Sequence, residues 1–218
     1  DLKGDAMIKE ITGLHHITSM ASNADANNVF FTKTLGLRRV KKTVNFDAPE
    51  VYHLYYGDEI GTPGSIMTYF PFAKMSPGQR GAGEVSITEF AVPKDALGFW
   101  KERLSALGVS SLMESSFLGE KRLSFDGPDG DDFALVESDV RDRTPWAEAD
   151  VPEDAGIIGF HGARFSLQDA AATGELLKFM GYQKDETRGN ITRYRIEGGN
   201  AADTIDLEEL PSAGTSSQ

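Results

Sequence analysis

The chain has 218 residues, 26% of them charged and 39% hydrophobic, which is typical of an ordered globular protein and excludes disordered, collagen-like and coiled-coil classes. Its 34 Asp and Glu outnumber its 22 Lys and Arg, so the net charge of −12 argues against nucleic acid and anionic membranes as partners. Because the chain has no Cys, any metal site must use His, Asp or Glu, and we expect a cytoplasmic location.

The start of the chain carries no recognisable targeting signal. Residues 1–6 lack the apolar core of a signal peptide, and no run in the chain reaches the ~18 apolar residues of a membrane span. We therefore expect the folded part to begin at Met7.

Three segments of the sequence repeat one pattern of a strand, a helix and further strands closed by a glycine-rich hairpin. The first begins at Gly13 with a strand at 13–18, followed by a helix with apolar residues at 29–31 that ends at Gly36. Further strands are expected at about 38–44, 51–56 and 65–70, the last entered through the turn Gly61-Thr62-Pro63-Gly64.

The second segment begins at Gly83 with a strand at 83–88. Its helix carries Phe99, Trp100 and Leu104 and ends at Gly108, and the turn at 127–130 precedes a strand at 133–136. The acidic stretch that follows, with Pro145 and Pro152, predicts a solvated linker.

The third segment begins at Gly159 with a strand at 159–164. Its helix carries Leu176, Leu177 and Phe179 and ends at Gly181, and a turn at 198–200 precedes a strand at 204–207. The last residues are rich in Ser, Gly and Thr and are not expected to pack.

The elements together predict an α+β fold of tandem βαβββ modules with curved mixed sheets. The expected divisions are module 1 at 7–76, module 2 at 80–138, a linker at 139–156, module 3 at 157–210 and a tail at 211–218.

A repeated βαβββ unit with His on a first strand resembles the vicinal oxygen chelate superfamily, which holds glyoxalase, bleomycin-resistance proteins and extradiol ring-cleaving dioxygenases. Within it, the first segment resembles the hydroquinone-type ring-cleaving dioxygenases. The matching motifs are Gly-Leu-His-His-Ile-Thr at 13–18, Thr-Val-Asn-Phe-Asp at 43–47, Tyr-His-Leu-Tyr-Tyr-Gly-Asp-Glu at 52–59, Gly-Thr-Pro-Gly at 61–64 and Met-Thr-Tyr-Phe-Pro at 67–71.

This resemblance implies four modules, of which three are present, and one Fe(II) held by two His and one Glu; Mn, Zn or another divalent metal are the alternatives. It implies that His16 is the metal ligand from the first module, while nothing here matches the other two ligands, which the family draws from a fourth module. It also implies catalytic support from His15 and Thr18 beside the metal, and a small aromatic substrate and O₂ as partners.

Other polar residues have a structural interpretation. His53 is expected to be a cross-strand packing or hydrogen-bonding residue, and Asp206 a solvated charge at a strand end. His161 aligns with His15 when the three segments are matched on their first glycines, which leaves Ser86 and Gly162 at the position of His16.

The sequence predicts a metal-dependent ring-cleaving dioxygenase acting on hydroquinone-like or catechol-like rings, truncated before the module that supplies the other ligands. The 218-residue chain alone is expected to be inactive, with an empty or weakly occupied site. Because modules 2 and 3 pair in this family, module 1 would be left open, which predicts either a homodimer or a missing fourth module. The alternatives are a metal-free protein that binds aromatic ligands or drugs, and a glyoxalase-type isomerase or epimerase.

Overall fold

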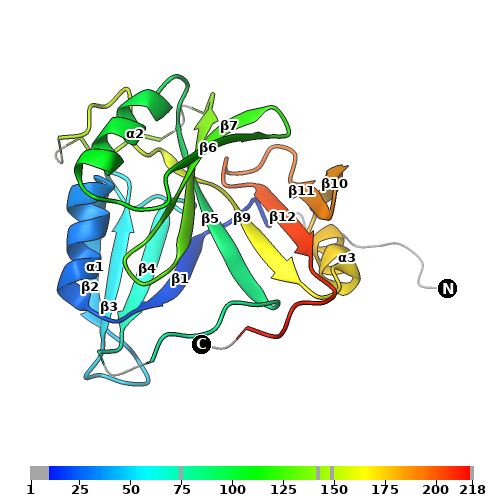
Figure 1. The fold of residues 1–218 in the computed structure, drawn as a ribbon, viewed down its shortest axis with the longest axis horizontal. Helices are drawn as coiled ribbons and strands as arrows, with labels where there is room; N and C mark the ends of the chain where they lie inside the picture. The colour runs from blue at the N-terminus through cyan, green and yellow to red at the C-terminus, as the bar shows by residue number, and fades with distance from the viewer. Residues whose placement is uncertain (1–9, 74–75, 141–142, 148–149, 217–218) are drawn as a thin grey trace.

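A computed structural model describes residues 10–73, 76–140, 143–147 and 150–216, so the expected start at Met7 lies outside the described residues. The first part of the chain forms a four-stranded sheet in the order β1-β4-β3-β2 (Figure 1). Its strands are β1 (His16–Ala21), β2 (Arg38–Val44), β3 (Tyr52–Gly57) and β4 (Ile66–Pro71). Strand β1 runs parallel to β4, and β3 is antiparallel to both of its neighbours.

One face of this sheet is covered by an α-helix that continues directly into a π-helical turn. It begins as α1 (Ala24–Val29), where the Asn23 side chain accepts a hydrogen bond from the Ala26 backbone N–H. It continues as a π-helical turn, η1 (Phe30–Thr34), and ends before Gly36, which has the left-handed φ of +69° that a helix end favours. The opposite face of the sheet carries no helix, and we call it the open face.

The rest of the chain forms an eight-stranded sheet in the order β10-β11-β12-β9-β5-β8-β7-β6. Its strands are β5 (Glu84–Pro93), β6 (Met113–Phe117), β7 (Glu120–Asp126), β8 (Asp132–Ser138), β9 (Gly159–Leu167), β10 (Gln183–Arg188), β11 (Ile191–Arg195) and β12 (Thr204–Glu209). Its helices are α2 (Leu97–Ala106) and α3 (Ala171–Phe179). The antiparallel pair β5–β9 joins the second and third segments into this one sheet, in agreement with the pairing of modules 2 and 3 that the family resemblance implied.

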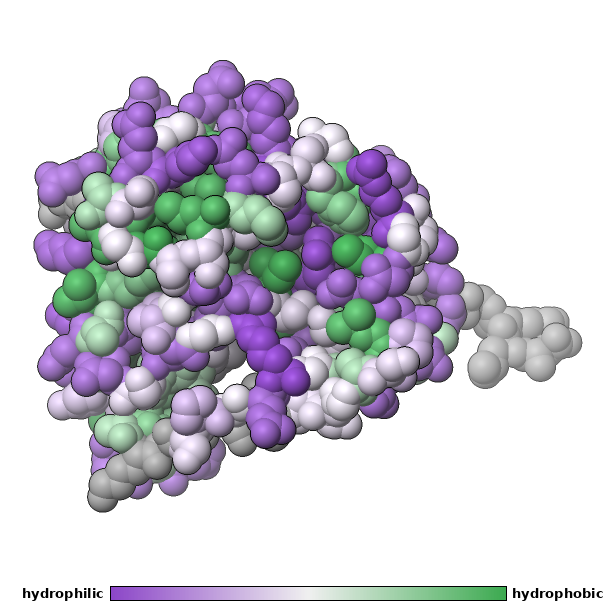
Figure 2. All heavy atoms as spheres, viewed as in Figure 1, coloured by the Kyte–Doolittle hydropathy of each residue, from purple (hydrophilic) through white to green (hydrophobic). Residues whose placement is uncertain are grey.

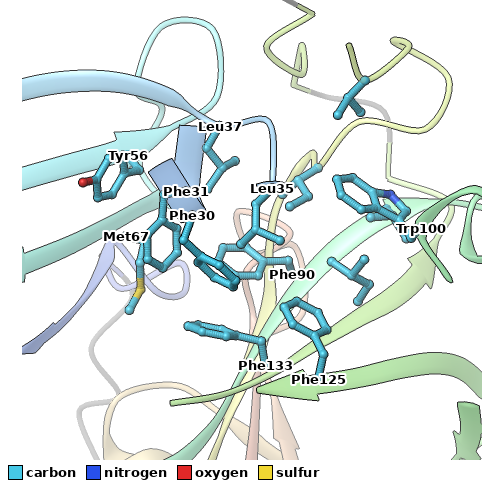
Figure 3. Packing of buried hydrophobic residues seen from close by; sticks show 14 of the residues in the cluster. Phe30, Phe31, Leu35, Leu37, Tyr56, Met67, Phe90, Trp100, Phe125 and Phe133 are labelled. Carbon is cyan, nitrogen blue, oxygen red and sulfur yellow. The ribbon is translucent and has the colours of Figure 1, made fainter. Parts of the chain in front are cut away.

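The main core lies between the first sheet and the second segment, where their helix-bearing faces meet (Figure 3). Phe31 of η1 is fully buried. Its ring contacts Tyr56 and Tyr69 of the four-stranded sheet and Phe133 of β8. A smaller core lies under α3 and includes Leu177, Tyr194, Ile205 and Leu207. The apolar positions that alternate along each strand therefore face a helix, and the intervening side chains point to the opposite face of the sheet.

Two expectations about the connecting segments are wrong. The acidic stretch 139–156 is not a solvated linker, because Val151 and Ala155 are buried and the Trp100 indole N–H donates to the Ala155 carbonyl oxygen at 2.7 Å. The tail packs as well: the Ala82 N–H donates to the Gly214 carbonyl at 2.8 Å, and the Ser216 N–H donates back to Ala82 at 2.9 Å. Both segments are polar in composition. Two buried apolar side chains hold the first against the protein, and backbone hydrogen bonds hold the second.

The surface seen in Figure 2 mixes hydrophilic and hydrophobic residues and shows no single apolar expanse. Isolated large apolar side chains are exposed elsewhere, such as Phe46 at 96% and Ile60 at 77%. None of the helices in the described part of the chain is long and apolar enough to cross a membrane.

Candidate functional site

The backbone that leads into β1 is fixed by hydrogen bonds from distant parts of the chain. The Gly64 N–H donates to the His15 carbonyl at 2.7 Å, and the Leu14 N–H donates to the Ala202 carbonyl at 2.8 Å. The Asn200 amide also donates to the Leu14 carbonyl at 2.8 Å. A Cβ on Gly13, at a φ of +143°, would lie 2.2 Å from Asn200 Oδ1, so only glycine fits there.

Arg143, in the segment expected to be a linker, holds these parts together. Its buried guanidinium donates to the Gly64 carbonyl at 2.9 Å and to the Asn200 carbonyl. It therefore connects the hairpin turn of the first segment with that of the third, and both turns fix the start of β1. These hydrogen bonds hold the backbone just before His16 and so fix where His16 lies.

His16 and Thr18 lie on the open face of the first sheet, and both are exposed. His15 lies just before β1, so strict strand alternation does not apply to it, and its Nδ1 is 3.1 Å from Nδ1 of His16. The two rings meet edge to face with centroids 5.2 Å apart. The structure thus brings together the three residues that the family resemblance implicated, His15, His16 and Thr18.

Three more residues of the open face continue the polar surface across the sheet. Thr18 Oγ1 lies 2.8 Å from Thr68 Oγ1 on β4, and Thr68 Oγ1 lies 3.1 Å from Nε2 of His53 on β3. Nδ1 of His53 is 2.7 Å from the Tyr55 hydroxyl. We call these four residues, Thr18, Thr68, His53 and Tyr55, the polar chain.

The expectation that His53 packs and hydrogen-bonds across strands is confirmed by these contacts. Its ring centroid is 4.0 Å from that of Phe70 and 4.1 Å from that of Tyr55. The sequence did not link His53 to the neighbourhood of His16. The available signal was that Thr68, four residues after the hairpin Gly64, pairs with both Thr18 and Tyr55.

Both imidazoles of the open face favour the neutral form. Burial, and then the neighbouring His15, lower the pKa of His16. Burial, followed by His16 and Lys41, lowers the pKa of His53. Burial raises the pKa of the Tyr55 hydroxyl. A neutral imidazole has a free nitrogen lone pair, which is the form that binds a metal ion or accepts a proton.

The donors of the open face fit only part of a metal site. His16 and His15 offer imidazole nitrogens and Thr18 offers a hydroxyl, which suit a divalent transition metal. Within the described ranges, no group of three or more His, Asp or Glu side chains is placed to hold a metal ion. The remaining donors of a two-His, one-carboxylate site would have to come from outside the described residues.

The face of the eight-stranded sheet that lies away from α2 and α3 contains a buried ionic cluster, and we call it the closed face. Arg193 is 1% exposed and binds the Asp206 carboxylate through Nε at 2.7 Å and Nη2 at 2.9 Å. Its Nη1 donates to Glu120 at 2.6 Å. The expectation that Asp206 is a solvated strand-end charge is therefore wrong, because antiparallel pairing places Arg193 directly opposite it.

Further charges complete this cluster. Arg122 donates to Glu89 at 2.6 Å, and Arg195 donates to Glu120 at 2.7 Å. His161 Nε2 lies 3.3 Å from Glu120. Burial would raise the pKa of Glu120, but His161 and Arg193 outweigh it and lower this pKa to about 2.

Phe117, at the end of β6, closes the cluster. Its ring lies 5.2 Å from the guanidinium carbons of Arg122 and Arg164, and 5.4 Å from that of Arg193. A cationic guanidinium group is attracted to the face of an aromatic ring. The Phe117 ring therefore stabilises the three arginines that it contacts. The charged side chains of this cluster are directed mainly at one another, whereas His16 is exposed.

The predicted equivalence of His16, Ser86 and Gly162 stays a prediction. Within each segment, Thr68, Ala134 and Asp206 pair with Thr18, Glu89 and Arg164 respectively. Strand β5 carries register irregularities, which an alignment on the first glycines does not show.

The chain is similar in sequence to proteins named as ring-cleaving dioxygenases. The chain is 39% identical over 206 residues to the putative ring-cleaving dioxygenase MhqO of Bacillus subtilis, covering 94% of this chain and 65% of that protein. It is 36% identical over 206 residues to the chlorohydroquinone/hydroquinone 1,2-dioxygenase of Sphingobium indicum, covering 91% of this chain and 64% of that protein. The chain therefore spans just under two thirds of the length of these curated relatives.

Solved structures agree. A crystal structure of a putative dioxygenase from Bacillus subtilis superposes with a TM-score of 0.92 at 37% identity, over 98% of this chain and 67% of that one. Glyoxalase I from Zea mays superposes with a TM-score of 0.66 at 14% identity, over 94% of this chain and 71% of that one, which shows a shared fold. A search of family models gave no match.

Proposed function

Since the chain belongs to the vicinal oxygen chelate superfamily, close to the hydroquinone-type ring-cleaving dioxygenases, we propose that it takes part in oxidative cleavage of hydroquinone-like or catechol-like rings by O₂. The observation that carries this proposal is the exposed His16 on the open face, beside His15 and the polar chain. The absence of Cys from the whole chain supports a cytoplasmic site of action.

In this proposal His16 holds a divalent metal ion, with Fe(II) as the first choice and Mn or Zn as alternatives. A bound Fe(II) would supply a centre at which an aromatic diol and O₂ can meet. The chain's own residues then bind and orient the ring: Thr18 offers a hydroxyl next to His16, and His15 lies against the His16 ring.

The remaining donors are proposed to come from a fourth module or from a second copy of the chain. Two observations support this. Strand β1 pairs only with β4 within the described part of the chain, so its other edge can accept a further strand. The open face carries His16 and Thr18 exposed, whereas the closed face holds the buried side chains of Arg193 and Asp206.

The test is metal analysis and O₂ uptake with the protein as its gene encodes it. The protein, loaded with Fe(II) under argon, should consume O₂ when hydroquinone or catechol is added, and the 218-residue chain alone should not. Stoichiometric iron and ring cleavage by the 218-residue chain as a monomer in light scattering would contradict the proposed source of the donors. No O₂ uptake with any aromatic diol would contradict the proposed function.

An aromatic-ligand binding protein is the second candidate. It is supported by the aromatic rings of Tyr55 and Phe70, which flank His53 on the open face. Tight binding of an aromatic diol by the metal-free protein as encoded, without O₂ uptake after iron loading, would favour this candidate.

A further inference from the structure

The polar chain links the neighbourhood of His16 to a residue on another strand. It runs from Thr18 on β1 through Thr68 on β4 to His53 and Tyr55 on β3, with successive heavy-atom distances of 2.8, 3.1 and 2.7 Å. Thr68, in the middle, is fully buried, so its hydroxyl depends on these partners. Thr18, at one end, is exposed two residues from His16 on the same face.

The chemistry of the four groups allows only two complete hydrogen-bonding arrangements. A neutral imidazole has one N–H and one lone pair, and each hydroxyl has one hydrogen. In the first arrangement Tyr55 donates to His53 Nδ1, His53 Nε2–H donates to Thr68, and Thr68 donates to Thr18. The Thr18 hydrogen is then free to donate outward from the sheet.

In the second arrangement every bond is reversed. Thr18 donates to Thr68, Thr68 donates to Nε2, and Nδ1–H donates to the Tyr55 oxygen. The Thr18 oxygen can then accept a hydrogen bond from outside, and the Tyr55 hydrogen points away from the chain. Thr18 can therefore meet either a hydroxyl or an ionised oxygen, provided that His53 can change tautomer.

We propose that His53, with Thr68 and Tyr55, positions a phenolic hydroxyl of an aromatic diol at Thr18 and conducts the proton of that hydroxyl to the solvent at Tyr55. This inference rests on the proposed function and assigns His53 and Tyr55 as positioning residues, since neither touches the ring oxygen directly. It differs from the sequence interpretation, in which His53 is structural only.

The proton transfer balances. The phenol O–H proton passes to Thr18, the Thr18 proton to Thr68, and the Thr68 proton to His53 Nε2. The Nδ1 proton passes to Tyr55, and the Tyr55 proton to water. The substrate is left as a phenolate that accepts a hydrogen bond from Thr18, one proton enters the solvent, and each member of the chain remains neutral in the opposite arrangement.

The packing around His53 supports a fixed orientation of its ring. Phe70 and Tyr55 lie 4.0 and 4.1 Å from its centroid, which holds both nitrogens in the line of the chain. The charged and titratable groups that face it are His16 and Lys41, the latter with its ammonium 5.7 Å from the centre of the Tyr55 ring.

The test uses 4-nitrocatechol, whose visible spectrum reports its ionisation, added anaerobically to the Fe(II)-loaded protein as its gene encodes it. Tyr55→Phe removes one hydroxyl and keeps the ring, and we expect about 3- to 10-fold weaker binding, as for a lost hydrogen bond, with ionisation of the bound probe moved to higher pH. The matched control is Tyr52→Phe, the same change on the same strand outside the chain, which should leave affinity and pH profile unchanged.

His53→Leu should weaken binding by about 10- to 100-fold, since it interrupts the chain and leaves Thr68 with Thr18 as its remaining partner in the chain. His53→Gln can bridge Thr68 and Tyr55 in either arrangement by turning its amide, but it cannot pass a proton from one side to the other. It should therefore bind the probe within about 3-fold of the wild type in both ionisation states, and a loss as large as that of His53→Leu would contradict the positioning role of His53.

A second measurement does not need the metal. The ¹⁵N chemical shifts of His53 in the metal-free protein should show that Tyr55→Phe changes its tautomer, and that Tyr52→Phe does not. If the wild type binds the probe but Tyr55→Phe and His53→Leu leave its affinity and pH profile unchanged, and Tyr55→Phe leaves the His53 tautomer unchanged, the polar chain has no such role. If the wild type neither binds the probe nor consumes O₂ with any diol, the proposed function itself falls.

Discussion

The open face and the closed face differ in how their polar groups are used, although the order β1-β4-β3-β2 of the first sheet recurs in each half of the eight-stranded sheet, as β5-β8-β7-β6 and β9-β12-β11-β10. On the closed face, Arg193 is enclosed by Asp206, Glu120 and Phe117, so its hydrogen-bonding capacity is directed to protein atoms. On the open face, His16 and Thr18 are exposed, and the imidazoles favour the neutral form.

In our proposal, one copy of the repeated unit serves stability and another serves chemistry. Charges that pair with one another rigidify a sheet, whereas neutral groups with lone pairs remain available to a ligand. The closed face contains the ionic cluster, and the open face keeps His16 and Thr18 exposed. Mutations on the two faces should accordingly have different kinds of effect.

The largest expected effect is that of His16→Ala on activity. In the protein as encoded, it should lower iron retention and O₂ uptake with hydroquinone by on the order of 100-fold or more, because the proposed metal ligand is removed. The fold should survive, since His16 is exposed and fills no core position. The readouts are iron per protein and O₂ consumption, with thermal unfolding as a check on folding.

His161→Ala is the matched control, because it removes an imidazole from the closed face. It should leave the iron content unchanged. Equal iron loss in both variants would break the distinction between the two faces.

Arg193→Met should give the largest loss of stability. It removes the cation that pairs with Asp206 and Glu120, and breaking a buried ion pair by removing one partner costs about 3–5 kcal/mol. Urea unfolding would measure this. Lys178→Met, which removes the exposed pair with Glu175, is the control and should cause no measurable change.

Acid should weaken the closed face through Glu120. The pKa of Glu120 is about 2 in the folded state against an ordinary value of 4.5, so this carboxylate stabilises the fold above about pH 4.5. That contribution, about 2 kcal/mol after allowance for partial solvent screening, is lost as the pH falls from about 4.5 to 2.

Glu120→Gln should therefore flatten the stability profile between pH 4.5 and 2 relative to the wild type. Urea unfolding at a series of pH values measures this, with Glu175→Gln as the control. An unchanged slope in Glu120→Gln would show that the cluster does not depend on this carboxylate.

Glycines and apolar alternation made much of the fold predictable. Each helix was placed before a glycine that the structure finds at positive φ, Gly36, Gly108 and Gly181. Asp206 was misread because its environment depends on Arg193, on the other side of the hairpin turn. Counting outward from Gly199 and Asn200 would have placed the two residues opposite one another.

The candidate site was only partly predictable. A family resemblance led to His15, His16 and Thr18, but the polar chain depends on side-chain directions across three strands, which a linear pattern does not specify. The role of Arg143 was hidden for a different reason. It stands in an acidic, proline-containing stretch whose composition indicates solvent exposure, yet it binds two carbonyl oxygens in the interior.

The smallest expected effect concerns the ring that closes the ionic cluster. Phe117→Leu keeps an apolar side chain over Arg122, Arg164 and Arg193 but removes the aromatic face, which should cost about 1 kcal/mol of stability. Phe46→Leu is the control, because Phe46 is 96% exposed and should tolerate the change. Neither variant should alter iron content. A gain of iron binding in Phe117→Leu would mean that this ring hides a second metal site, and the contrast between a structural face and a chemical face would fail; unchanged iron together with a small, salt-sensitive loss of stability would sharpen it.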